Sequence, residues 1–393
     1  EPFQHFWQAK PNLLGRFIRG TERYKKLVGR GVASQEAMSR LLENESFVDS
    51  LKSDKTTLQV GFVALDPTNG HVKAWVGGRD FTTEKFDHVS LARRQPGSTF
   101  KPFVYTAAID NGYSPYYTLP DDTLTFTDPH TGKKWTPMNF AGTVSGDPLT
   151  LKQALVQSKN TVTARLVQQV GPERVVSYAH RMGIESPLNA VPSIALGTSS
   201  VTLLEMTSAY TTLANRGLHS EPRLITRIED RYGNVLAQFA PEREVALSEQ
   251  TAYTMVDMMR GAIAPDGTGF RIRSQYGIDH DVIGKTGTTQ NSADGWFMLA
   301  HPELVAGAWT GFNDQNVTFR TQYWGQGAHN ALHLVGGFFR GAIDHPEVSL
   351  ADAAFLPPDD YERPLPTPAS SDSARGDTTG RPPALPVNDR TEW

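Results

Sequence analysis

The segment "RRQPGSTFKPFVYTAAIDNG", residues 93–112, holds a hydroxyl and an amine that could act together. Ser98 lies three residues before Lys101, so in a helix the two side chains can come within hydrogen-bonding distance. A neutral lysine amine can remove the proton of a serine hydroxyl when burial or nearby positive charge lowers its pKa. Pro102 has no N–H and is tolerated in the first turn of a helix. The segment therefore predicts a nucleophilic serine beside a helix that begins close to Ser98.

Two further patterns follow in the chain. Ser-x-Asn occurs at Ser158 and Asn160, in a segment predicted to be helical, and Lys-Thr-Gly-Thr occurs at residues 285–288. Ser-x-x-Lys alone is a weak signal, because 24 serines and 13 lysines in 393 residues give about 0.8 matches by chance. About 0.1 matches to Lys-Thr-Gly are expected by chance. The ordered set of three patterns is therefore more informative than any one of them.

Strands and helices must position these residues. Residues 57–78 contain two apolar, β-branched runs around Asp-Pro-Thr-Asn-Gly and are predicted to form a β-hairpin. Helical periodicity occurs over residues 150–170 and again over 201–217, where Gly217 is a predicted helix stop. Three short strands separated by turns are predicted between residues 280 and 312. The last region is therefore expected to be an antiparallel meander.

The other segments are predicted to flank this core. Residues 1–57 are charged and helical, with one helix starting at a Ser34 cap, and are interpreted as a connector or a small accessory piece. Residues 114–148 are rich in Pro, Asp and Thr and form an excursion between helical parts. Residues 356–393 contain eight of the 26 prolines and are predicted to be a disordered tail or a linker.

The composition excludes several classes of function. No stretch of the sequence approaches 18 consecutive apolar residues, so no membrane span is predicted in it. A net charge of −4 gives no general attraction to nucleic acid or acidic lipid. The lack of cysteine excludes disulfides and thiolate catalysis, and fits an extracytoplasmic compartment. His329 and His333 have the spacing of a metal pair, but no third ligand is evident and no metal site is predicted.

The three ordered patterns resemble the signature of the penicillin-recognising serine acyl transferases. Four longer segments resemble the transpeptidase domain of class A, bifunctional penicillin-binding proteins: "RRQPGSTFKPFVYTAAIDNGYSP", "ALDPTNGHVKAWVGGRD", "PSIALGTSSVTLLEMTSAYTTLANRG" and "GKTGTTQNSADGWF". This resemblance implies an α/β (α+β) fold, in which a five-stranded antiparallel sheet is flanked by helices and the active site lies between the sheet edge and an all-helical lobe, as in serine β-lactamases. It also implies a connector over residues 1–57, a transpeptidase domain over 58–355 and a tail over 356–393.

The resemblance implies a role for each residue of the three patterns. Ser98 would attack the penultimate D-alanine carbonyl of a peptidoglycan stem peptide, and Lys101 would be its general base. Ser158 would relay the proton toward the leaving D-alanine nitrogen. Asn160 would hold the substrate amide or the Lys101 amine. Lys285 would supply positive potential near Ser158 and the substrate carboxylate.

The resemblance implies further contacts along residues 286–288. Thr286 and Thr288 would hydrogen-bond the substrate carboxylate, and Gly287 would let the acyl-donor backbone lie against this strand. The backbone N–H groups of Ser98 and Thr288 would form the oxyanion hole. No metal or organic cofactor is implied.

Class A penicillin-binding proteins also carry a membrane anchor and an N-terminal glycosyltransferase domain, and neither appears in this sequence. We expect the natural protein to be longer, with a monofunctional protein as the alternative. The expected location is extracytoplasmic, with membrane attachment only through the missing anchor. The expected partners are donor and acceptor stem peptides, β-lactam antibiotics and other cell-wall synthesis proteins, but not nucleic acid.

Three other functions share the same patterns. A serine β-lactamase must hydrolyse its acyl-enzyme quickly, but no Glu occurs in the context that serves class A β-lactamases, and the second pattern is Ser-Lys-Asn rather than Ser-Asp-Asn. A D,D-carboxypeptidase differs only in using water as the acceptor. A non-catalytic β-lactam or peptidoglycan sensor would form the acyl-enzyme without turnover.

Overall fold

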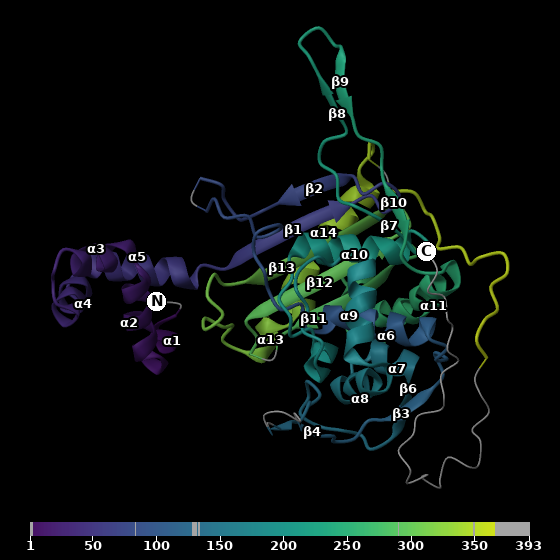
Figure 1. The fold of residues 1–393 in the computed structure, drawn as a ribbon, viewed down its shortest axis with the longest axis horizontal. Helices are drawn as coiled ribbons and strands as arrows, with labels where there is room; N and C mark the ends of the chain where they lie inside the picture. The colour runs from purple at the N-terminus through teal and green to yellow at the C-terminus, as the bar shows by residue number, and fades with distance from the viewer. Residues whose placement is uncertain are drawn as a thin grey trace.

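A five-stranded antiparallel sheet forms the centre of the fold (Figure 1). The computed structural model describes residues 3–82, 84–127, 132, 134–289, 291–348 and 350–365. The strand order is β11-β12-β13-β1-β2, with β1 at Gln59–Leu65, β2 at Val72–Val76, β11 at Ile283–Thr288, β12 at Asp294–His301 and β13 at Leu304–Gly311. The predicted hairpin is β1–β2 and the predicted meander is β11–β12–β13, so both are confirmed, as is the five-stranded sheet.

Helices cover both faces of this sheet. On one face lies α10 (Leu203–Ala214), whose Met206 and Tyr210 share a core with Met298. On the other face lies α14 (Ala331–Asp344), which packs through Val335 against Phe297. The strands β12 and β13 are buried on both faces along their whole length, so their sequences are almost continuously apolar.

The helical lobe that carries the nucleophile segment is built around α6 (Lys101–Asp110). The side chains of residues 101–108 are all buried, so this helix has no polar face. A 3-10 helix, η1 (Gly97–Phe100), leads into α6, and Pro102 is the second residue of α6. The predicted helix start close to Ser98 is therefore confirmed. The other helices of the lobe are α7 (Leu151–Val156), α8 (Asn160–Val170), α9 (Pro172–Arg181) and α11 (Glu249–Arg260).

Two helix boundaries differ from the predictions. The helix predicted over residues 150–170 is interrupted, because α7 ends at Val156 and Ser158 adopts a left-handed backbone with φ of 56°. The helix α4 (Ser34–Leu42) begins at Ser34 itself, and Ala33 occupies the cap position. Gly217, with φ of 87°, follows the end of α10 and donates its N–H to Thr212 O, as expected of a helix stop.

The N-terminal residues form a helical unit at one side of the sheet (Figure 1). Its helices are α1 (Gln4–Ala9), α2 (Pro11–Gly20), α3 (Glu22–Gly29), α4 and α5 (Glu45–Thr56). Leu13 and Phe17 of α2 share a small core with Phe312 and Val317, which follow β13. Among the described residues, none of the helices is both long enough and apolar enough to cross a membrane.

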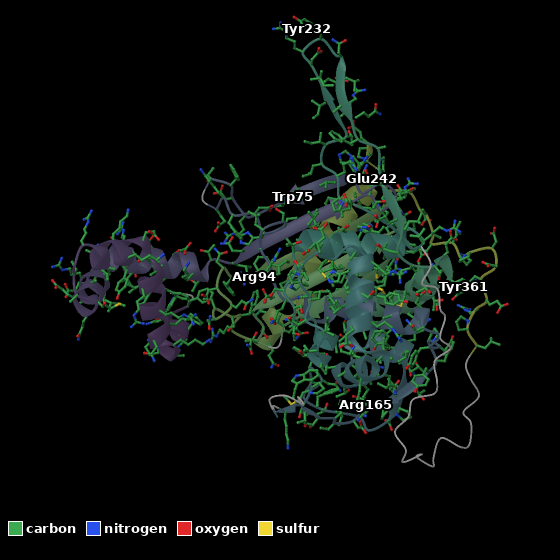
Figure 2. The ribbon with its side chains drawn as sticks, viewed as in Figure 1. Trp75, Arg94, Arg165, Tyr232, Glu242 and Tyr361 are labelled. Carbon is green, nitrogen blue, oxygen red and sulfur yellow. The ribbon has the colours of Figure 1, made fainter. Side chains whose placement is uncertain are left out.

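Shorter elements complete the fold. The hairpin of β8 (Arg227–Glu229) and β9 (Val235–Gln238) projects from the body and carries Tyr232 at its tip (Figure 2). The excursion contains two strand pairs, β3 with β6 and β4 with β5. The remaining bounds are β3 (Thr118–Pro120), β4 (Phe126–Thr127), β5 (Lys134–Trp135), β6 (Pro148–Thr150), β7 (Leu218–Ser220), β10 (Arg243–Val245), η2 (Pro192–Leu196), η3 (Gly261–Ile263), α12 (Arg271–Ser274), α13 (Gln322–Gly325) and η4 (Gly327–His329).

The C-terminal segment is described only as far as residue 365. Phe355 is buried in the main core, and the ring of Tyr361 lies edge-on to Tyr253 of α11, with 4.7 Å between the ring centroids. Residues 356–365 of the predicted tail thus lie against the helical lobe rather than apart from it. Residues 366–393 fall outside the described residues.

Candidate active site

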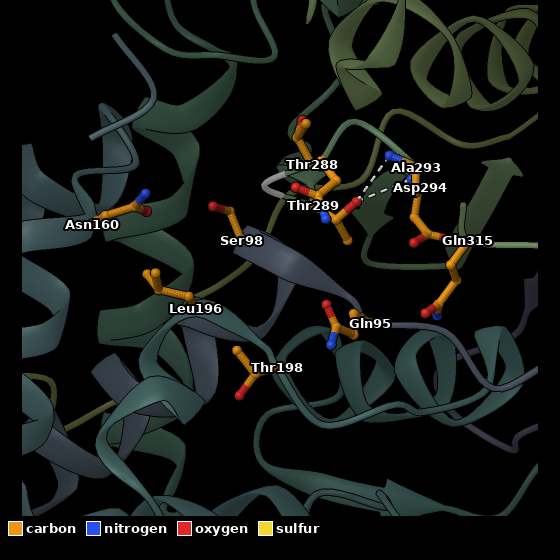
Figure 3. A pocket seen from close by; sticks show the side chains of 11 residues that line it. Gln95, Ser98, Asn160, Leu196, Thr198, Thr288, Thr289, Ala293, Asp294 and Gln315 are labelled. Carbon is orange, nitrogen blue, oxygen red and sulfur yellow. Dashed lines mark hydrogen bonds between the residues drawn. The ribbon is translucent and has the colours of Figure 1, made fainter. Parts of the chain in front are cut away.

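The hydroxyl of Ser98 faces a cavity of about 160 Å³ between η1, the end of β11 and the start of α8 (Figure 3). The cavity is lined mostly by polar side chains: Gln95, Ser98, Asn160, Leu196, Thr198, Thr288, Thr289, Asn291, Ala293, Asp294 and Gln315. Ser98 is half-buried, and its hydroxyl has no hydrogen-bond partner among the described residues. The residue predicted to be a nucleophile is therefore accessible from this cavity.

Lys101 is fully buried and contacts Asn160, which lines this cavity. Its amine donates to Ser158 O at 2.5 Å, to Ser158 Oγ at 3.2 Å and to Asn160 Oδ1 at 2.7 Å. Burial lowers the pKa of Lys101 well below its ordinary value, and the nearby charge of Lys285 lowers it further. The expected hydrogen bond to Ser98 is not present among the described residues, because the amine is directed toward these three oxygens. Burial is the main cause of this lowered pKa, and a lowered pKa favours the neutral form of the amine, which can accept a proton.

Ser158 connects the two buried lysines of the site. Its hydroxyl oxygen accepts from Lys101 Nζ and, at 3.0 Å, from Lys285 Nζ. Burial lowers the pKa of Lys285 to about 7. The sequence placed Ser158 within a helix, but its left-handed backbone turns the chain between α7 and α8 and directs the hydroxyl toward β11.

The strand β11 lies at the edge of the sheet and borders the cavity through Thr288. Thr289 N donates to Asp294 O at 3.2 Å, so Thr288 and Gly295 form the adjacent, non-hydrogen-bonded pair. The N–H of Thr288 therefore faces the open edge of the sheet. The N–H of Ser98, in the first turn of η1, has no acceptor among the described residues. Both predicted oxyanion-hole donors are thus available.

Residues 286–288 of β11 make contacts within the protein that the sequence did not predict. Gly287 leaves room for η1, since a Cβ there would lie 2.6 Å from Pro96 O and 2.9 Å from Thr99 Cγ2. Its missing side chain therefore leaves room for the serine segment, and the expected contact of this glycine with a substrate backbone stays a prediction. Thr286 shares a 2.7 Å hydrogen bond with the hydroxyl of Thr268, and Thr288 Oγ1 accepts from Gly327 N at 3.3 Å.

Sequence reasoning missed two groups that hold the site in place. Arg94 donates to Phe312 O at 2.6 Å and lies over the ring of Trp309, with its guanidinium 3.9 Å from the buried carboxylate of Asp294. These contacts anchor the chain just before η1 to the sheet. The second group centres on Asp121, in the excursion between α6 and α7, where no sequence motif pointed to it. Both groups escaped sequence reasoning because each makes its contacts with residues that are far away in the sequence.

The histidine pair is engaged in other contacts. His329 Nδ1 lies 2.6 Å from Arg271 Nη1, and His333 Nδ1 lies 2.8 Å from the hydroxyl of Tyr276. Within the described part of the chain, no three His, Asp or Glu side chains gather as a metal site would require.

Comparisons with known proteins agree on one family. The model of the penicillin-binding protein transpeptidase domain matches residues 60–298. Penicillin-binding protein 2D of Bacillus subtilis is 37% identical over 285 residues, which are 72% of this chain and 40% of that protein. Penicillin-binding protein 1A of Pseudomonas aeruginosa is 33% identical in an alignment of 320 positions, which covers 68% of this chain and 38% of that protein. The chain thus spans about two fifths of the length of these relatives.

Solved structures share the fold. Penicillin-binding protein 1A from Haemophilus influenzae superimposes with a TM-score of 0.69 at 28% identity, over 77% of this chain and 49% of that one. PonA1 from Mycobacterium tuberculosis, solved in complex with penicillin V, superimposes with a TM-score of 0.67 at 22% identity, over 90% of this chain and 99% of that one.

Proposed function

The chain belongs to the penicillin-binding protein transpeptidase family, and we propose that it is a serine acyltransferase that cross-links peptidoglycan stem peptides through an acyl-enzyme on Ser98. The donor is a stem peptide that ends in D-Ala-D-Ala, and the acceptor is an amine of a second stem peptide. β-Lactam antibiotics acylate the same serine. The reaction takes place outside the cytoplasm, in a longer protein held at the membrane and working with other cell-wall synthesis proteins.

One observation carries this proposal. The three sequence patterns lie on separate elements: at the start of α6, between α7 and α8, and on β11. Groups from all three elements gather around the hydroxyl of Ser158. Lys101 and Lys285 both reach Ser158 Oγ, and Asn160 reaches Lys101, while Ser98 opens to the adjoining cavity. A set of groups that could take up and return a proton next to a free serine supports acyl transfer.

The first half-reaction follows from these positions. Burial lowers the pKa of Lys101, and in its neutral form this amine accepts the Ser98 proton as Oγ attacks the penultimate D-alanine carbonyl. The N–H groups of Ser98 and Thr288 stabilise the oxyanion, and one such donor is typically worth about 3–4 kcal/mol. When the C–N bond breaks, the proton passes through Ser158 to the leaving D-alanine nitrogen. The product is an ester between Ser98 and the donor peptide.

The second half-reaction returns the enzyme to its starting state. The acceptor amine attacks the ester carbonyl and gives one proton through Ser158 to Lys101. The bond between the acyl carbon and Ser98 Oγ then breaks, the new amide bond remains, and Ser98 Oγ takes that proton from Lys101. At pH values below its lowered pKa, Lys285 is protonated and supplies positive charge near the donor carboxylate that Thr286 and Thr288 bind. The polar lining of the cavity, including Gln95, Thr198 and Gln315, suits a peptide backbone.

Turnover of a defined donor tests the proposal. The protein would be incubated with a peptide ending in D-Ala-D-Ala and an excess of an amino-acid amine, and the products followed by mass spectrometry. Equal release of D-alanine and formation of the new amide supports transpeptidation. Release of D-alanine with only the hydrolysed peptide would favour a D,D-carboxypeptidase, and acylation without release would favour a sensor.

A further inference from the structure

A buried carboxylate lies behind the loop that carries Ser158 and Asn160. The side chain of Asp121, which follows β3, has no exposed surface and accepts five hydrogen bonds. Its two oxygens accept from Thr161 Oγ1 at 2.5 Å, Asn139 Nδ2 at 2.7 Å, Lys159 Nζ at 2.8 Å, Ser145 Oγ at 3.1 Å and Ser145 N at 3.2 Å. Burial raises the pKa of Asp121, but these donors, with Lys159 first among them, lower it further than burial raises it. The carboxylate is therefore ionised across the neutral range.

Two of these donors belong to the loop itself. Lys159 is the central residue of the Ser-x-Asn pattern, and Thr161 follows Asn160 in the first turn of α8. The side chain of Lys159 is thus directed toward Asp121, and away from the two lysines at Ser158. The ion pair fixes one side of the loop to the excursion.

Asn139 carries the effect of Asp121 to the helix. Because its amide nitrogen donates to the carboxylate, its Oδ1 is turned toward α8, where it accepts from Asn160 N at 2.8 Å and Thr161 N at 3.4 Å. The residue at the cap position of α8, Lys159, has no side-chain acceptor. Asn139 therefore caps α8 from a distant part of the sequence.

The same segment sets the direction of the Asn160 side chain. Its Nδ2 donates to Met138 O at 2.7 Å, which leaves its Oδ1 facing the Lys101 amine at 2.7 Å. Beside it, Ser158 has a left-handed backbone, which a residue with a side chain rarely adopts. This conformation persists only where surrounding contacts hold it.

From these contacts we propose that Asp121 is a positioning residue for the acylation of Ser98, acting through Lys159, Thr161 and Asn139 to hold Ser158 and Asn160 against Lys101. The inference rests on the proposed function. The carboxylate does not touch the cavity. The Asp121 carboxylate can hold these groups because all five contacting atoms donate hydrogen bonds to it. An amide at this position would place its own N–H groups against some of these donors, and those hydrogen bonds would be lost.

Asp121→Asn is the direct test, because the side chain keeps its shape. The measured quantity is the second-order rate constant for acylation by a fluorescent penicillin, taken as a function of pH. We expect a loss on the order of 10- to 100-fold, as for a small misplacement of reacting groups. The titratable group that faces Lys101 is Lys285 of β11. The other contacts of the Lys101 amine are neutral oxygens of Ser158 and Asn160. A looser loop admits water to Lys101, so the rise of the rate with pH moves to higher pH.

Glu205→Gln provides a matched control. Glu205 also accepts five hydrogen bonds, from Glu185 N, Ser186 N, Ser186 Oγ, Thr202 N and Thr202 Oγ1, and none of these residues lines the cavity. This variant should lose thermal stability but keep the wild-type rate and pH profile. Lys159→Met, which removes a partly exposed partner, is a milder second variant and should shift the rate in the same direction as Asp121→Asn.

The outcomes separate the two proposals. Slow acylation and a shifted profile in Asp121→Asn and Lys159→Met, but not in Glu205→Gln, support the positioning role. Wild-type rates and profiles in folded Asp121→Asn or Lys159→Met protein, or losses that follow thermal stability in all three variants, would overturn it. Wild-type protein that penicillin does not acylate would instead overturn the proposed function.

Discussion

Lys101 and Lys285 donate to the same oxygen, Ser158 Oγ, at 3.2 and 3.0 Å. Two ammonium groups in one buried site repel each other and are poorly solvated, so the arrangement favours the loss of a proton. Burial lowers the pKa of both amines, that of Lys285 to about 7 and that of Lys101 well below its ordinary value. The Lys101 amine can therefore serve as a base.

Lys101→Arg tests whether this amine is the base. The charge is kept, but a guanidinium does not lose its proton in the accessible pH range. We expect acylation by penicillin to fall by about 10²-fold or more, the usual contribution of a general base. In the wild type the rate should rise with pH through an apparent pKa that belongs to the coupled lysines. An arginine variant that acylates at the wild-type rate would show that another group removes the proton.

Lys285→Met should change how stability depends on pH. The folded-state pKa of Lys285, about 7, lies below the ordinary value of 10.5, so between these limits the unfolded chain binds more protons. The free energy of unfolding of the wild type should therefore rise with pH in this window, and one proton contributes about 1.4 kcal/mol per pH unit. Urea titrations at pH 7.5 and 9.5 give the unfolding free energy at each pH. The variant should lose the part of its increase with pH that Lys285 contributes in the wild type. An unchanged slope would mean that the buried amine keeps its proton.

Gly97→Ala should disturb the site through the backbone. Gly97 has φ of 56°, and a Cβ there would lie 2.6 Å from Thr288 O, so η1 would be forced away from β11. We expect a loss of more than about 2 kcal/mol in unfolding free energy and much slower acylation.

Gly112→Ala is the control for that change. Gly112 follows α6, has φ of 89° and has open space where a Cβ would stand. The unfolding free energy of Gly112→Ala should fall only by the cost of a left-handed backbone, about 1–2 kcal/mol, and its acylation rate should not change. Equal losses of acylation in both variants would show that the contact between Gly97 and Thr288 is not needed.

The sequence predicted those features that depend on local chemistry. Pro102 fixed the start of α6, and the apolar runs predicted the hairpin and the meander. The break at Ser158 was not predictable, because the periodicity on both sides is helical and the contacts that turn the chain come from Asp121 and Asn139, far away in the sequence.

The candidate site was predicted in composition but not in all its contacts. Hydrogen bonds join Lys101, Ser158, Asn160 and Lys285, and Asn160 lines the same cavity as Ser98. The space beside Gly287 is filled by Pro96 and Thr99, a contact between segments about 190 residues apart that no local pattern encodes. Sequence spacing alone also placed the Lys101 amine at Ser98, whereas in the structure it donates to Ser158 and Asn160.

The penicilloyl-enzyme should persist for many minutes to hours. The former ring nitrogen stays attached to the acyl group after the β-lactam opens, so it cannot leave as D-alanine does and it obstructs water. Hydrolysis would need a second base. Within the described residues, Asp294 is the carboxylate that lines the cavity, and it is buried against Arg94 and Trp309. Following the mass of the adduct after removal of free drug tests this; loss within seconds, with multiple turnover, would point to a β-lactamase.

The site of the penicillin adduct tests the central claim most directly. The protein would be treated with penicillin and digested, and the modified peptide identified by tandem mass spectrometry, with Ser98→Ala treated in parallel. We expect one adduct, on Ser98, and a folded variant with an unchanged circular dichroism spectrum that carries no adduct. An adduct on Ser158, or a Ser98→Ala variant that is labelled like the wild type, would contradict the assignment of Ser98 as the nucleophile.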